Sequence, residues 1–226
     1  MAVIDMELEA VLRPVEMSLP AYPPKVILLS NGQNLVIRQV RREDVPVLLQ
    51  AVRPLCDVDR DFTDLIGARL YAELLGWYRF RLRNGYCLIG QVDGRLVGIM
   101  NGRVYSQEIG INYHTLEIDR RLRAGPHLFA AKMEYHIEVL GQEEVWTTAE
   151  RPISFRKWMV EYVLESQTDA QHELGGSPSW RLSREHYMGI RDRMVAGERP
   201  VPPELLETSM REIIVSAVGK RSGGRT

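Results

Sequence analysis

Apolar and polar residues alternate near the start of the chain in a way that predicts a hairpin and then a helix. Residues 26–40 hold two short apolar runs around Asn31-Gly32, a dipeptide that favours a tight turn between antiparallel strands. Glu43 and Asp44 follow, and acidic residues are stabilising at the positive end of a helix dipole. We therefore expect two paired strands and a helix that begins near Asp44.

A longer helix and a second hairpin are predicted next. Residues 63–82 place leucines at helical spacing and carry several aromatic residues. Residues 86–92 and 95–105 are apolar runs joined by Asp93-Gly94, another turn dipeptide. The pattern predicts one helix followed by two antiparallel strands.

The middle of the chain indicates a strand, a basic loop and a third helix. Residues 112–118 predict the strand, and the arginine-rich residues 120–125 form the loop. Pro126 suits the first position of a helix, where no N–H group is needed, and Gly141 ends that helix. Apolar residues on two sides of the helix indicate that it covers a sheet. Three more elements follow: a strand at 145–149, a helix at 153–163 and a last strand at 180–187.

Proline-rich segments divide the chain into one domain with two extensions. We expect an N-terminal extension at 1–24, with a short helix at 6–12. Residues 25–193 form the domain, and residues 194–226 form a linker, an amphipathic helix and a tail. That helix, at 204–218, has an apolar face suited either to a protein partner or to folding back on its own domain.

Composition and charge narrow the classes of function. The chain has 226 residues and a net charge of −1, so it offers no broad basic surface for nucleic acid. It has no run of about 18 apolar residues, which a membrane helix would need. Cys56 and Cys87 lie far apart in apolar segments, which indicates reduced thiols and a cytoplasmic protein. No group of residues has the spacing of metal ligands.

Several short motifs occur along the chain in an order that has a known parallel. They are Ile37-Arg38 with Glu43-Asp44, the run 90–98, and Leu116-Glu117-Ile118 leading into Arg123-Ala124-Gly125-Pro126. Over residues 26–187 this order resembles the GNAT superfamily of acyl-CoA-dependent N-acetyltransferases. The resemblance implies an α/β (α+β) fold, with a mixed, mostly antiparallel central sheet flanked by helices. It also implies transfer of an acetyl group from acetyl-CoA to an amine acceptor, either a small molecule or a protein.

The resemblance places the acyl-CoA pyrophosphate at the start of the third helix, against backbone N–H groups. The residues implied to bind the cofactor are Ile118, Arg123, Ala124, Gly125, His127 and Leu128. The family pattern there is arginine or glutamine followed by alternate glycines. Arg123 fits this pattern, whereas Ala124 and Pro126 replace two glycines and Leu128 replaces a small residue. Pro126 also removes one N–H donor.

Glu117 and Tyr162 are the implied catalytic residues. Glu117 lies on the face of its strand opposite its apolar neighbours, from which it could take the ammonium proton of the acceptor. The alternative is a solvent-facing glutamate, and His114 is a second candidate base. The family's general-acid tyrosine aligns with Trp158, which has no acidic proton, so Tyr162 would substitute unless it is a core residue. The candidates for the acceptor pocket are Tyr71, Trp77, Tyr78 and Tyr105.

A second interpretation is a catalytically silent member of the fold. Such a chain would serve as a binding or structural module, for example as a subunit of a larger assembly such as that of a phage. The gap between the strands at 112–118 and 145–149 separates the two interpretations. Free N–H groups lining an open gap favour catalysis, whereas a gap filled by Leu128, Trp158 or Tyr162 favours the silent module.

Overall fold

An eight-stranded sheet forms the centre of the structure. The computed structural model describes residues 17–57, 62–79, 81–148, 155–172 and 178–215. In the order in which they lie side by side, the strands are β1 (Lys25–Leu28), β2 (Asn34–Gln39), β3 (Gly85–Val92), β4 (Arg95–Val104), β5 (Ile109–Glu117), β6 (Glu144–Thr147), β8 (Pro178–Ser183) and β7 (Glu165–Gln171). Neighbours are antiparallel except β5 and β6, which run parallel. The predicted mixed, mostly antiparallel sheet is confirmed.

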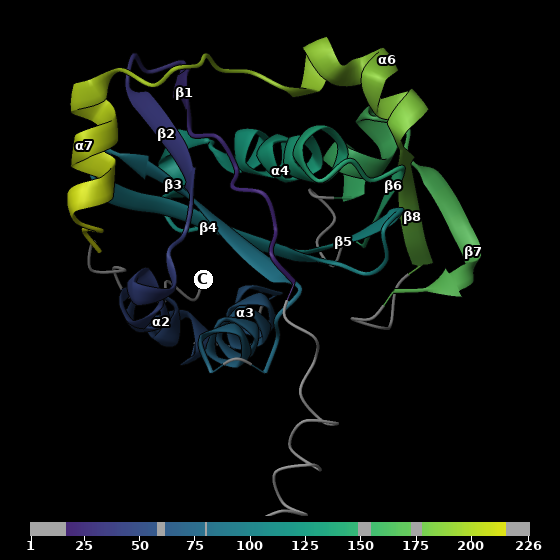
Figure 1. Ribbon diagram of the computed structural model, residues 1–226, viewed down its shortest axis with the longest axis horizontal. Coiled ribbons are helices and arrows are strands. Elements are labelled where there is room, and N and C mark those ends of the chain that lie inside the picture. Colours follow the sequence, from purple (N-terminus) through teal and green to yellow (C-terminus); the bar gives the residue numbers. More distant parts are fainter. Residues whose placement is uncertain (1–16, 58–61, 80, 149–154, 173–177, 216–226) are drawn as a thin grey trace, which may run out of the picture.

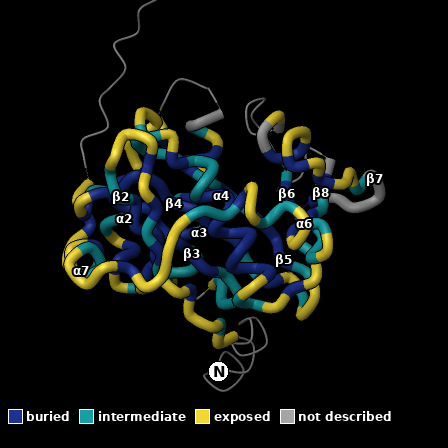
Figure 2. Tube along the Cα trace, turned by 90° about the horizontal axis from the view of Figure 1, so that it is seen from above, coloured by how far each residue is buried: buried dark blue, intermediate teal, exposed yellow. Residues whose placement is uncertain are grey.

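Helices cover the sheet on both faces, as Figure 1 shows. Helices α2 (Val45–Val52) and α3 (Phe62–Tyr78) lie on one face, and α4 (Gly125–Glu134) lies on the other. Figure 2 shows that the buried residues concentrate in the central strands and in α4. The other helical elements are 3₁₀ turns at Arg42–Asp44, Arg53–Asp57 and Arg120–Leu122, π-helical segments at Tyr135–Val139 and Phe155–Glu161, and the helices α6 (Arg184–Met194) and α7 (Pro203–Arg211). Within the described residues, no helix is both long and apolar enough to cross a membrane.

Strand β5 departs from regular pairing at two places that matter for the site. It pairs with β6 only from Ile109 to Ile111, so the two strands part beyond that point. On its other side, one residue of β4, Asn101, lies opposite two residues of β5, Tyr113 and His114. This is a β-bulge, which re-aims the side chains of the bulged strand.

The predicted secondary structure differs from the structure in several places. The predicted strand at 180–187 ends at Ser183, because Ser183 accepts a hydrogen bond from the His186 N–H group and begins α6. Strand β7 has no predicted counterpart, since its sequence lacks any alternation of apolar residues. The helix predicted at 63–82 ends earlier, at Tyr78. The helix predicted at 6–12 lies outside the described residues, as do the starts or ends of several other predicted segments.

Both segments predicted as extensions pack on the domain where the structure describes them. The Tyr22 hydroxyl donates to Glu134 Oε2 over 2.7 Å, and Arg199 Nη1 donates to Glu134 Oε1 over 2.8 Å. Lys25 Nζ also donates to Glu134 Oε2, over 2.8 Å. This group of four side chains, in which Tyr22, Lys25 and Glu134 are buried, holds the chain before β1 and the chain after α6 against α4.

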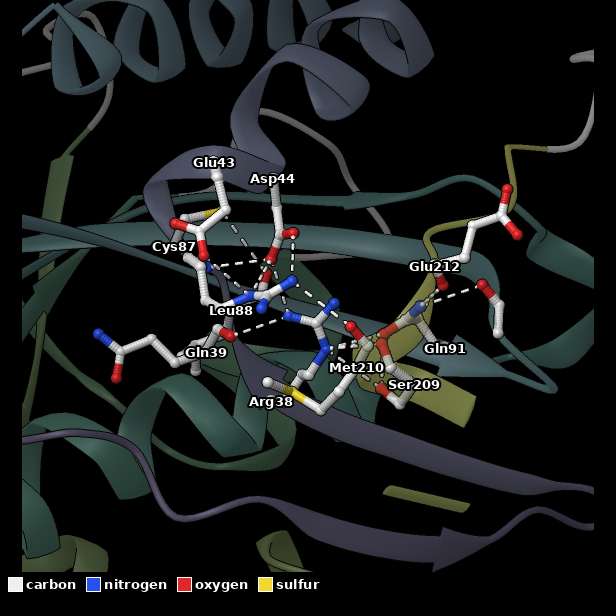
Figure 3. Close-up of polar contacts among 12 residues, drawn as sticks. Arg38, Gln39, Glu43, Asp44, Cys87, Leu88, Gln91, Ser209, Met210 and Glu212 are labelled. Atoms are coloured by element: carbon white, nitrogen blue, oxygen red, sulfur yellow. Dashed lines mark hydrogen bonds and ion pairs between the residues drawn. The ribbon is translucent and has the colours of Figure 1, made fainter. Parts of the chain in front are cut away.

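The C-terminal helix α7 is held on the sheet by Arg38, as Figure 3 shows. The Arg38 side chain is only 1% exposed, and its Nε donates to the Ser209 carbonyl and to Gln91 Oε1, each over 3.1 Å. Its Nη1 donates to Asp44 Oδ2 over 3.1 Å. Helix α7 therefore folds back on its own domain, one of the two arrangements that its apolar face allows.

Candidate functional site

The first turn of α4 binds a carboxylate of the chain itself. Arg123 adopts a left-handed backbone, with φ of 51°, and α4 begins at Gly125. The Gly125 N–H group donates to Glu117 Oε1 over 3.1 Å, and the Ala124 N–H group donates to the same carboxylate. A helix N-terminus favours an anion through its free donors and its dipole. The N–H donors that the resemblance assigns to a pyrophosphate are therefore occupied by Glu117.

The environment of Glu117 is partly apolar. Burial raises the pKa of this carboxyl, and the two N–H donors oppose that rise only in part. The side chain points toward α4, whereas Leu116 packs on the other face with α2 and α3. The predicted face of Glu117 is thus correct, but that face leads to the start of α4 and not to the pocket described below.

The other predicted cofactor residues divide into exposed and engaged groups. Arg123 is exposed at the loop, together with Arg120 and Arg121. The Ile118 N–H group donates to the Val97 carbonyl over 2.7 Å, so it belongs to the sheet. His127 is half-buried, and burial, followed by the charge of Lys25, lowers the pKa of its imidazole.

Ala124 and Leu128 are core residues. Both are fully buried in the apolar cluster between α4 and the sheet. Leu128 lies over Gly90 and Gly98, where any β-carbon would collide with its methyl groups. These glycines leave room for the leucine, so its side chain is directed at β3 and β4 and does not line an open gap.

An aromatic stack fills the space between α4 and the π-helical segment Phe155–Glu161. The ring of Trp158 lies face to face with that of Phe129, with centroids 4.1 Å apart and planes 9° apart. Tyr162 follows, its ring 6.1 Å from Trp158, and its carbonyl oxygen accepts a hydrogen bond from His186 Nε2. Trp158 and Tyr162 are both buried. The structure does not bring Tyr162 and Glu117 together, because one lies in this stack and the other at the start of α4.

A histidine occupies the place where β5 and β6 part. His172 follows β7 and is buried, and its imidazole lies against the backbone of Asn112 and of Trp146. Burial lowers the pKa of His172 to about 4, so the ring is neutral. Beside it, Asn112 Nδ2 donates to Thr147 Oγ1 over 2.5 Å. The sequence offers no signal for His172, since its position depends on a strand that the pattern does not predict.

A pocket opens on the opposite face of the sheet, against α3. Its polar lining includes Glu73, Asn101, Arg103 and Tyr113, and Trp77 forms part of its apolar wall. Asn101 Nδ2 donates to Glu73 Oε2 over 2.5 Å. Glu73 Oε1 lies 3.1 Å from His114 Nε2. At the bulge in β5, Tyr113 lines this pocket, and the adjacent His114 contacts Glu73.

The neighbourhood of the pocket contains a buried lysine. Lys132 Nζ donates to the His114 carbonyl over 2.8 Å, and burial lowers the pKa of its ammonium well below the usual range. The sequence pattern indicates His114 as a candidate base but does not single out Glu73. A signal for Glu73 exists, because it is an acid directly beside Leu74 on the apolar face of a predicted helix. Within the described residues, no group of three or more acidic, histidine or cysteine side chains could hold a metal ion.

The four aromatic residues predicted for an acceptor pocket have different positions. Trp77 lines the pocket. Tyr71 and Tyr78 pack against the apolar cluster of α2 and α3. Tyr105 is exposed and stacks on Trp146, with ring centroids 6.2 Å apart.

Comparison with known proteins yields similar structures only. No family model matches the chain, and no curated protein matches it. An uncharacterized protein from Bacillus halodurans is similar over 85% of this chain and 100% of its own, with 9% identity and a TM-score of 0.51. A putative acetyltransferase from T. thermophilus has 14% identity and a TM-score of 0.46, covering 76% of this chain and 95% of its own. The spermidine/spermine N-acetyltransferase of Vibrio cholerae has 10% identity and a TM-score of 0.47, and the similarity covers 70% of this chain and 98% of its own.

At these identities the likeness concerns the fold alone. The strand order is the one that the resemblance implies, with two helices between the first hairpin and the second and with α4 before the parallel strand. The only parallel pair among the described strands is the pair that opens beside α4. The chain therefore has the GNAT fold, in a divergent form.

Proposed function

We propose that the protein is an acyltransferase that moves an acetyl group from acetyl-CoA to an amine acceptor. The observation that carries this proposal is the contact between Glu73 and His114 beside the pocket under α3. A carboxylate paired with an imidazole in a concave site is a common arrangement for taking up a proton. His114 of this pair lies at the bulge in β5, a few residues after the last residue of β5 that pairs with β6.

The donor set at α4 suits the phosphates of an acyl-CoA in its chemistry. Two backbone N–H groups already hold a carboxylate there, and three exposed arginines lie within the same loop. When bound, acetyl-CoA supplies the acyl thioester. Arg123 and the N–H groups of Ala124 and Gly125 would hold its phosphates once Glu117 gives up its place.

The chain's own residues would prepare the acceptor. An amine enters the pocket as an ammonium ion, which cannot attack a carbonyl group. The Glu73–His114 pair takes one proton from it and leaves the nitrogen lone pair free. Asn101 keeps the Glu73 carboxylate oriented toward the pocket through its 2.5 Å hydrogen bond. Glu117, the base implied by the resemblance, lies on the α4 side of the sheet, and its role as a base stays a prediction.

The test is a Glu73→Gln variant assayed for acetyl-CoA-dependent thiol release with a panel of amines. We expect kcat to fall about 100-fold or more, with a small change in KM for acetyl-CoA. Asp64→Asn is the matched control, because Asp64 also lies on α3 but does not line the pocket. Equal activity in the wild type and Glu73→Gln would remove the pair from the mechanism.

A second candidate function is the silent module. The stack of Trp158 on Phe129 and the contact of Glu117 with Gly125 favour it, because both fill space that an acyl-CoA would need. In this candidate, the segment 204–218 serves as a partner site only if α7 leaves Arg38. Calorimetry of the wild type and of Glu117→Ala with acetyl-CoA at low salt separates the candidates. No binding to either variant at about millimolar ligand would favour the module.

A further inference from the structure

The carboxylate of Glu117 and an external phosphate would use the same donors. Glu117 Oε1 takes the Gly125 N–H group over 3.1 Å, and the Ala124 N–H group is also directed at this carboxylate. Pro126, the next residue, has no N–H group to offer. The Gly125 and Ala124 donors are therefore in use, and an incoming anion gains these two only when Glu117 leaves.

The surroundings of this contact still favour a negative charge. Arg120, Arg121 and Arg123 are exposed on the turn that precedes α4, and Arg121 is paired with Asp119. A single carboxylate at the helix start thus leaves an excess of positive charge in the loop.

We infer that Glu117 is an autoinhibitory contact, an internal carboxylate that occupies the phosphate site of the proposed acyltransferase and must be displaced before acyl-CoA binds. The identity of the ligand rests on the proposed function, whereas the competition for the N–H groups does not. Because the competitor belongs to the same chain, its effective concentration is high and independent of protein concentration. The affinity of this site for an external anion is accordingly lower than it would be if Glu117 did not occupy the N–H groups.

The experiment uses inorganic pyrophosphate as the probe and the full chain labelled with nitrogen-15. The amide signals of Gly125 and Ala124 are followed during titration at low salt in the wild type, Glu117→Gln and Glu117→Ala. We expect pyrophosphate to shift these signals in Glu117→Ala with an affinity about ten-fold or more above that of the wild type. Glu117→Gln should lie between the two, because its amide oxygen still accepts a hydrogen bond but carries no charge.

Asp119→Asn is the matched control. It removes the same charge two residues away, but Asp119 accepts from Arg121 N–H groups and not from α4. An equal gain in Asp119→Asn and Glu117→Ala would overturn the inference, since the effect would then be one of net charge alone. No gain in Glu117→Ala, with the wild-type fold retained in its amide spectrum, would overturn it too.

A second titration with acetyl-CoA separates this inference from the proposed function. If pyrophosphate binds Glu117→Ala more tightly than the wild type while acetyl-CoA binds neither, the contact is confirmed and the acyltransferase is not. If acetyl-CoA binds the wild type and removal of Glu117 changes neither affinity, the acyltransferase stands and the autoinhibitory contact does not.

Discussion

The hydroxyl of Tyr86, on β3, lies 2.7 Å from Nε2 of His136. His136 belongs to the π-helical segment that follows α4. The other ring nitrogen, Nδ1, lies 2.5 Å from Gln142 Oε1. Both contacts suit a neutral imidazole, which donates to the amide oxygen from Nδ1 and accepts the hydroxyl proton at Nε2. Gly110 makes this arrangement possible, because any side chain there would collide with the ring and with Gln142.

Gly110→Ala should destabilise the protein. Its β-carbon would overlap the His136 ring and Gln142 Oε1, and neither can move without breaking a buried hydrogen bond. We expect a loss of about 1–3 kcal/mol in the free energy of unfolding, measured in urea. Gly189→Ala is the control, because the space around Gly189 in α6 is open and alanine favours a helix. A smaller loss in Gly110→Ala than in the control would contradict the packing described here.

The stability should depend on pH through His136. Burial lowers its pKa to about 4, from 6.5 in the absence of the fold. The unfolded chain therefore binds the proton more readily, and stability falls as the pH drops from 6.5 to 4, by about 3 kcal/mol at the acid end. The ring signal of His136 in proton NMR should titrate near pH 4. A titration near pH 6.5 in the folded protein would show that the ring is not held neutral.

The stability should also depend on pH through Glu134, in a lower range of pH than through His136. Three donors, Tyr22, Lys25 and Arg199, lower the pKa of its carboxyl to about 2 against the desolvation that raises it. Because the folded pKa lies below the unfolded value of 4.5, the stabilisation is complete above pH 4.5 and is lost as the pH falls toward 2.

The measurement compares Glu134→Gln with the wild type at several pH values. The variant should be less stable by about 2 kcal/mol or more at pH 7, and the difference should shrink below pH 4.5. Glu204→Gln, an exposed position on α7, serves as the control with little change. A difference that stays constant down to pH 2 would mean that the charge of Glu134 contributes nothing.

Arg38 should be the residue that keeps α7 on the domain. Arg38→Ala removes its hydrogen bonds to Asp44 and Gln91, but Asp44 keeps Arg41 and Gln91 keeps the Ser209 hydroxyl, so we expect a loss of about 1.5–3 kcal/mol. Ser209→Ala removes the hydroxyl that donates to Gln91 Oε1 and accepts from Arg38 Nε, and it should cost about 1 kcal/mol. Thr208→Ala is the neighbouring control on the exposed side of the helix. Proteolysis of the segment after α6 should be faster in Arg38→Ala than in Thr208→Ala.

Local sequence signals predict most of the fold. The hairpin turns at Asn31-Gly32 and Asp93-Gly94 follow from residues that tolerate positive φ, and Gly32, Asp93 and Gly94 adopt it. Pro126 stands in the first turn of α4, as its second residue and not as the predicted first. Strand β7 and helix α6 escape prediction for different reasons. The first has no apolar alternation, and the second begins at a serine cap inside what reads as a strand.

The candidate site is less predictable, because its contacts join residues far apart in the chain. The face of Glu117 follows from the alternation of β5, but its partner at Gly125 depends on the turn at Arg123. The approach of Glu73 to His114 requires the bulge opposite Asn101, which no local pattern signals. His172 reaches β5 and β6 only through β7.

The bond from Arg38 to Ser209 has a consequence for how the protein is made. Arg38 belongs to the first hairpin, and its buried partner is synthesised 171 residues later. During translation β2 therefore leaves the ribosome long before α7. Until α7 is made, the Arg38 guanidinium is either hydrated or bound to other groups. Domains fold as units when their last required residue emerges. For this chain, that moment comes only after α7 has cleared the exit tunnel, so a ribosome stalled at the prolines before α7 would hold an incomplete core.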